Sequence, residues 1–100
     1  MTNLTVRFAA ASDLSELARL AALDSGKPPR GPALVAEADS RMLAALPLGS
    51  GRPIADPFEP TAEVVALLQL RAEQLREGEQ RSLGERARSL LRLRPNHARA

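Results

Sequence analysis

Apolar and polar positions alternate near the start of the chain and then take on the spacing of a helix. In residues 4–8 every second side chain is apolar, which is the period of a half-buried β-strand. From Leu14 to Leu23, leucine and alanine recur at helical spacing, and Asp13 and Glu16 stand at the spacing of a capping box. The chain is therefore predicted to open with a short strand, followed by a helix that ends at about Leu23.

Two extended segments follow a loop through which no helix can continue. Residues 24–32 combine two glycines with three prolines, so the helix must end and the chain must turn. Residues 33–38 and 41–47 have the apolar character and the length of strands, and only Asp39 and Ser40 separate them. A two-residue connection between two strands predicts a β-hairpin.

A further strand is expected over residues 54–58, after the turn sequence LGSGRP. Pro53 and Pro57 restrict it, because proline has no N–H to donate to a neighbouring strand. This strand is therefore expected at an edge of the sheet, or the two prolines are expected at the ends of the strand.

The strongest helical pattern lies between Thr61 and Gly78. From Val64 to Leu75 the apolar residues recur at the spacing of one face of an amphipathic helix. Thr61 is the expected N-cap, and Glu63 places a negative charge in the first turn. Gly78 is the expected end of the helix.

A second, weaker amphipathic segment is expected after Gly78. One of its faces is apolar, formed by Leu83, Ala87, Leu90 and Leu91. The opposite face is basic, formed by Arg81, Arg88 and Arg92. Residues 95–100 are small, polar and interrupted by proline, which predicts a disordered tail.

Together these elements predict an α+β protein with a small β-α-β-β-(β)-α sheet and a C-terminal amphipathic helical segment. The expected division is residues 1–78 for the α+β domain, 79–94 for a basic helical extension and 95–100 for the tail. A chain of 100 residues has room for one domain with one modest core.

The composition excludes several classes of active site. The sequence has no cysteine, tryptophan or tyrosine and a single histidine, His97. Without cysteine there is no disulfide, thiolate zinc site or cysteine nucleophile. One histidine cannot assemble a multi-histidine metal site or a histidine-assisted triad. No metal-binding residue is therefore assigned.

The net charge of +2 conceals a strong asymmetry. Residues 1–70 carry six Lys and Arg against eight Asp and Glu, whereas residues 71–100 carry eight Arg against four Glu. An arginine-lined helix can bind nucleic acid, an anionic membrane surface or an acidic protein patch. The interspersed glutamates and the lack of neighbouring aromatic residues make such binding weak. No leader pattern opens the chain and no apolar stretch is long enough to span a bilayer, so a cytoplasmic protein is expected.

The phrases VRFAAASDLSELARLAALDS and ALVAEADSRMLAAL resemble the N-terminal half of GNAT-type N-acetyltransferases. In that family the first phrase corresponds to a strand and a capped helix, and the second to the following hairpin. The resemblance covers about residues 4–77 and implies a half-GNAT-like sheet.

The family binds the pyrophosphate of acetyl-CoA with a loop rich in arginine and glycine, whose backbone N–H groups point at the phosphates. The matching stretch here, Asp56 to Thr61, has no glycine, two prolines and two acidic residues. Proline lacks an N–H, and carboxylates repel phosphate. The family's remaining strands and its tyrosine general acid have no counterpart in this sequence. The resemblance therefore implies the frame without the acetyl-CoA pyrophosphate loop, and no cofactor-binding residue is assigned.

Three groups of residues are candidates for chemistry. Glu37 lies where related enzymes sometimes place a carboxylate, but the alternation of its strand favours a solvent-facing side chain. Asp24, Ser25 and Lys27 form a polar cluster after the first helix, either a ligand contact or, as the favoured interpretation, a plain loop. His97 has no neighbouring ligand in the sequence. No catalytic residue is assigned.

The sequence favours a small, non-catalytic interaction or structural protein that associates with an unknown protein partner or with itself. One alternative is an acetyltransferase-like module completed by a second chain, the only case in which acetyl-CoA is expected as a cofactor. The other is a weak, non-specific binder of nucleic acid or anionic surfaces through Arg81, Arg88 and Arg92. Because a half-domain leaves sheet edges open, the C-terminal segment or another copy is expected to cover them.

Overall fold

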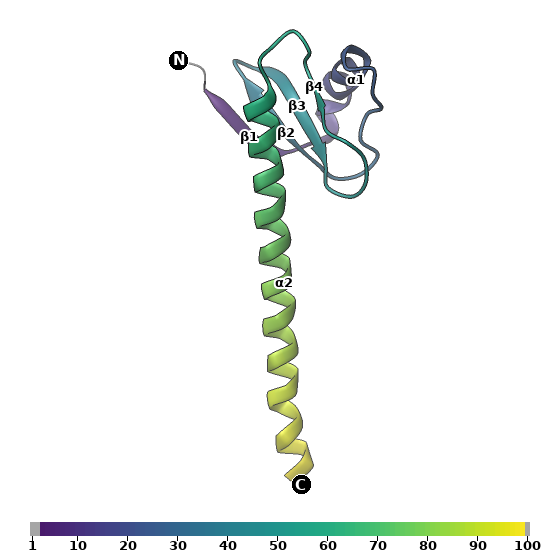
Figure 1. The fold of residues 1–100 in the computed structure, drawn as a ribbon. Helices are drawn as coiled ribbons and strands as arrows, with labels where there is room; N and C mark the ends of the chain where they lie inside the picture. The colour runs from purple at the N-terminus through teal and green to yellow at the C-terminus, as the bar shows by residue number, and fades with distance from the viewer. Residues whose placement is uncertain (1–2, 100) are drawn as a thin grey trace.

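The computed structural model describes residues 3–99, with side chains described through Ser89. Over these residues the α+β class is confirmed, with an antiparallel sheet and a long helix after the last strand (Figure 1). The strands are β1 (Leu4–Phe8), β2 (Ala33–Ala38), β3 (Arg41–Pro47) and β4 (Ile54–Ala55). The helices are a 3₁₀ turn η1 (Ala11–Asp13), α1 (Leu14–Leu23) and α2 (Ala62–Arg99).

The strands pair in the order β1-β2-β3-β4, so β1 and β4 are the edges of the sheet. The predicted hairpin of β2 and β3 is confirmed. Its two turn residues, Asp39 and Ser40, have φ of 51° and 65°. Positive φ at both positions gives the turn the twist that a two-residue hairpin needs.

The two α-helices cover opposite faces of the sheet (Figure 1). Leu34 points to one face and Val35 to the other, because successive side chains of a strand alternate. The core on the α1 side contains Leu17, Leu20, Ala21, Val35, Met42, Ala45 and Ile54. The core on the α2 side contains Leu34, Ala36, Ala44, Leu46, Leu68 and Ala72. Both faces of this small sheet are therefore packed.

The strand expected over residues 54–58 is shorter than predicted. β4 ends at Ala55, and Asp56 begins a turn in which its Oδ1 accepts a hydrogen bond from the Phe58 N–H at 2.9 Å. The Asp56 carbonyl oxygen accepts a further bond from the Glu59 N–H at 3.3 Å. An aspartate that bonds the backbone two residues on makes a local turn, and here it replaces the sheet pairing that Pro57 cannot provide.

The prediction that the long helix ends at Gly78 is wrong. α2 runs without interruption from Ala62 to Arg99, across Gly78 and through the part of 95–100 for which a disordered tail was expected. Gly78 and Gly84 do not have the positive φ of a glycine that ends a helix. A single glycine costs a helix only about 1 kcal/mol relative to alanine, and the neighbouring Leu, Arg, Glu and Gln are strong helix formers. The division of the chain after residue 78 remains a prediction.

The first turns of α2 lie against the sheet, and the rest of the helix projects away from it (Figure 1). The molecule measures 67 × 29 × 21 Å along its principal axes. Residues 73–89, termed the projecting segment, are exposed throughout, except for the half-buried Gly84. α2 packs on β2 and β3, the inner strands. Over the described residues it therefore covers a face of the sheet and not its edges, and the other alternative, that another copy covers the edges, stays a prediction.

Candidate functional site

Glu37, the candidate general base, is held by an arginine on the neighbouring strand. The Arg7 guanidinium donates to both of its carboxylate oxygens, from Nε at 3.0 Å and from Nη2 at 3.3 Å. Glu37 lies on the α1 side of the sheet just after a β-bulge, where its side chain is only 29% exposed. The prediction of a solvent-facing residue is thus only partly correct, and an arginine-bound carboxylate is a poor general base.

The same guanidinium binds Asp13 at the start of α1. Arg7 donates from Nη1 to Oδ2 at 2.8 Å and from Nη2 to Oδ1 at 3.0 Å. Oδ2 of Asp13 also accepts the Ala10 N–H at 2.6 Å. The Arg7 bonds, and then the Ala10 N–H, lower the pKa of Asp13 to about 2, while the two carboxylates raise the pKa of Arg7. This triad of charges fastens the entry of α1 to the sheet.

The capping box expected between Asp13 and Glu16 does not form. Asp13 bonds Ala10 and Arg7 instead, and Glu16 accepts hydrogen bonds from Arg19, with Nη2 at 3.0 Å, and from the Met42 N–H at 3.4 Å. Arg19 is the main cause of the lowered pKa of Glu16. These carboxylates tie α1 to the strands, which a local motif in the sequence cannot reveal.

Asp56, at the start of the loop between β4 and α2, points into the protein. It is 1% exposed, and its Oδ2 lies 3.8 Å from Arg19 Nη1 and 3.9 Å from Arg41 Nη2. The buried Arg19 Nη1 has no hydrogen-bond acceptor among the described residues. Asp56 therefore anchors the loop to the body through charge, and Glu59 is the acidic residue of this loop that remains exposed.

The residues of the polar cluster after α1 have different roles: Asp24 binds other parts of the protein, and Lys27 lines a cleft. Asp24 Oδ2 accepts hydrogen bonds from Arg52 Nη1 at 3.2 Å and from the Ala55 N–H at 3.1 Å, so this carboxylate ties the end of α1 to the β3–β4 loop and to β4. Ser25 adopts a positive φ of 52°. Lys27 lies in a cleft of about 460 Å³ together with Arg30 and Arg52. The clustering of these three cations is the main site feature that sequence reasoning missed, because the two loops are far apart in the chain.

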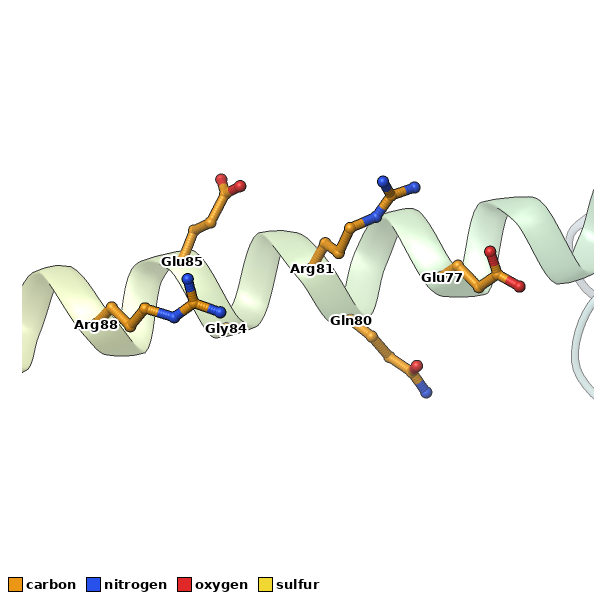
Figure 2. Close-up of a pocket in the computed structure, with 6 residues that line it drawn as sticks. All are labelled: Glu77, Gln80, Arg81, Gly84, Glu85 and Arg88. Atoms are coloured by element: carbon orange, nitrogen blue, oxygen red, sulfur yellow. The ribbon is translucent and has the colours of Figure 1, made fainter.

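Two arginines of the projecting segment, Arg81 and Arg88, lie on one exposed face of the helix. Glu77, Arg81, Glu85 and Arg88 follow one another along it at spacings of three and four residues, alternating in charge (Figure 2). Opposite charges at these spacings favour a helix. The depression that they line is formed by one helix alone. The side chains of Arg92 and His97 lie outside the described residues.

Comparison with protein-family models, curated proteins and solved structures finds no match to this chain. Over the described residues, no group of three or more acidic or histidine side chains is placed to hold a metal ion. In the same range, no helix has the length and apolar composition needed to cross a bilayer. The charged residues near the sheet are mostly engaged with one another, so the features that face outward are the cationic cleft and the projecting segment.

Proposed function

We propose that this chain is a small, non-catalytic interaction protein that pairs with a second copy of itself through the projecting segment. The observation that carries the proposal is the length of α2 beyond the sheet. Leu75 and Leu83 are 37% and 62% exposed on this stretch, although they continue the side of the helix on which Leu68 and Ala72 pack. A largely unsupported helix of this kind is marginal in water, and most helices gain their stability from an apolar contact.

The charge layout of the projecting segment selects a second copy in antiparallel orientation. Residues 73–80 carry three glutamates and one arginine, and residues 81–88 carry three arginines and one glutamate. In a parallel pair the two acidic halves would lie side by side, as would the two basic halves, so like charges would face each other. In an antiparallel pair each acidic half faces the basic half of the other copy, and the two-fold axis lies near the middle of the segment. The charges of this surface are therefore self-complementary in an antiparallel dimer.

The frame of this interaction protein is proposed to be similar to the N-terminal half of GNAT-type N-acetyltransferases. The order of elements and the placement of α1 and α2 on opposite faces support this likeness. The loop between β4 and α2 supports the lack of catalysis, because Pro57 and Pro60 offer no N–H and Glu59 is exposed. A cytoplasmic setting suits a sequence without cysteine.

Sedimentation equilibrium of the full chain tests the pairing. We expect a reversible dimer with a Kd in the range of about 10 μM, and Leu83→Glu is expected to weaken it at least tenfold, because it buries a charge in the contact. Leu70→Glu is the matched control, since Leu70 is a leucine of α2 outside the projecting segment and is 51% exposed, against 62% for Leu83. A wild-type monomer at several hundred micromolar, or equal weakening by both substitutions, would contradict the proposal.

A titration with acetyl-CoA distinguishes the non-catalytic proposal from its alternative, an acetyltransferase-like module completed by another chain. The non-catalytic proposal expects no heat of binding when acetyl-CoA is titrated into the full chain at micromolar concentration. Binding with a Kd of about 1 μM, equivalent to roughly −8 kcal/mol, would favour the alternative. The readout is calorimetric and needs no catalytic turnover.

A further inference from the structure

The cleft beside the end of α1 joins two loops that are far apart in the sequence. Its walls come from the α1–β2 loop, which supplies Lys27 and Arg30, and from the β3–β4 loop, which supplies Arg52. Its volume of about 460 Å³ lies within the range of small-molecule sites. Three of the lining side chains are cations and none is a carboxylate.

Two of these cations are available to a ligand. Lys27 and Arg30 are exposed, and among the described residues neither forms an ion pair within 4.0 Å. Like charges gathered in one cleft repel one another, and an anion placed between them removes that cost. The chain therefore holds positive charge here that nothing within the described structure neutralises.

The third cation is held in place by the protein. Arg52 donates from Nη1 to Asp24 Oδ2 at 3.2 Å and from Nη2 to the Asp24 carbonyl oxygen at 3.1 Å. A Cβ added at Gly26 would lie 3.0 Å from Arg52 Nη2 and 3.0 Å from Ile54 Cγ2, so a glycine lets the loop approach this closely. A side chain fixed before binding loses little freedom on binding. The pairing with Asp24 leaves a charge of about +2 for the cleft as a whole.

We propose that this cleft binds an organic phosphomonoester. A phosphate dianion matches the charge that remains, and both Arg and Lys bind phosphate through charge-assisted hydrogen bonds. The hydroxyls of Ser25 and Ser50 line the same cleft, and three prolines add apolar surface for the organic part of the ligand. The chain has no Trp or Tyr on which a base would stack, which favours a sugar or short aliphatic body. The site is separate in sequence from the Asp56–Thr61 loop and does not depend on pairing of the projecting segment.

The test is a titration of the ¹⁵N-labelled full chain with inorganic phosphate and with glycerol 3-phosphate, followed by amide chemical shifts. We expect saturable shifts confined to residues 24–32 and 48–53, with tighter binding of the organic phosphate. Lys27→Gln together with Arg30→Gln is expected to weaken binding at least about tenfold. Arg81→Gln together with Arg88→Gln is the matched control, because it removes the same charge from the projecting segment and leaves the cleft intact.

The absence of saturable binding to both glycerol 3-phosphate and vesicles that contain phosphatidic acid, equal weakening by both double variants, or equally tight binding of acetate would overturn the proposal. Vesicles of phosphatidylcholine containing phosphatidic acid identify the source of the phosphate. Binding to these vesicles without binding of glycerol 3-phosphate would assign the phosphomonoester to a lipid headgroup, and the reverse would assign it to a free metabolite. Because the shifts report on the cleft alone, their absence would leave the proposed dimer untouched.

Discussion

Arg7 binds two carboxylates at once in this small protein. One guanidinium binds Asp13, six positions along the chain, and Glu37, thirty positions away. The alternation of residues 4–8 correctly predicted a strand. It could not predict this pairing, because the partners become neighbours only when β1 lies beside β2 and η1 turns back over the sheet. The carboxylate that sequence reasoning offered as a general base is therefore used for structure.

The first prediction concerns acid stability. The pKa of Asp13 is lowered to about 2 in the folded protein, so its contribution to the free energy of unfolding is complete above about pH 4. It is lost as the pH falls from about 4 to 2, and the loss is expected to be about 1–2 kcal/mol. Denaturant unfolding at a series of pH values measures it.

Asp13→Asn is expected to flatten this part of the pH profile, because the substituted side chain does not titrate. Asp39→Asn is the control, since Asp39 is exposed in the hairpin turn and asparagine suits its positive φ. A profile of Asp13→Asn that keeps the full slope of the wild type between pH 4 and 2 would show that another carboxylate supplies the effect.

At the scale of elements, glycines with different backbone conformations have opposite roles. Gly51 has a φ of 121° in the β3–β4 loop, a conformation that an L side chain rarely adopts. Gly78 lies inside a continuous helix, and a Cβ added there would meet nothing within 4 Å. The first is required by the turn, and the second only weakens the helix.

Gly78→Ala is therefore expected to stabilise the protein by up to about 1 kcal/mol and to raise its helical circular dichroism. Gly51→Ala is expected to destabilise it by at least about 1 kcal/mol, because the added Cβ is strained at this φ. Both are measured by denaturant unfolding. Destabilisation by Gly78→Ala would indicate that the helix does end there, as the sequence alone suggested.

The elements were predictable where periodicity was strong and local. β1, α1, the β2–β3 hairpin and the start of α2 after Thr61 all follow from spacing and turn residues. The ends of β4 and α2 were not predictable, because each depends on two opposing local preferences of similar strength. At β4, the side-chain turn of Asp56 prevails over strand propensity, and in α2 the flanking helix formers outweigh Gly78. The cationic cleft depends on two loops meeting, which no local pattern encodes.

At the scale of the whole molecule, positive charge is carried on a helix where glutamates alternate with arginines. Binding of the chain to duplex DNA is expected to be weak, indifferent to sequence, and steeply reduced as salt rises from about 50 to 200 mM, because it depends on counterion release. Replacement of Arg81, Arg88 and Arg92 by Gln is expected to reduce this binding while leaving the fold intact. Fluorescence anisotropy with labelled duplexes of two unrelated sequences measures the effect. Selective, salt-insensitive binding that survives the triple replacement would place a recognition surface elsewhere.

The projecting helix also changes how the protein moves through solution. The radius of gyration of the whole protein is 18.8 Å, whereas a compact chain of this length has about 13 Å. An elongated particle of 10.7 kDa has a high frictional ratio and leaves a gel-filtration column early, at the position of a larger globular protein. A monomer would thus be mistaken for a dimer by elution volume alone. A dimer that overlaps its two long helices side by side would gain mass with little added length, so its frictional ratio would fall.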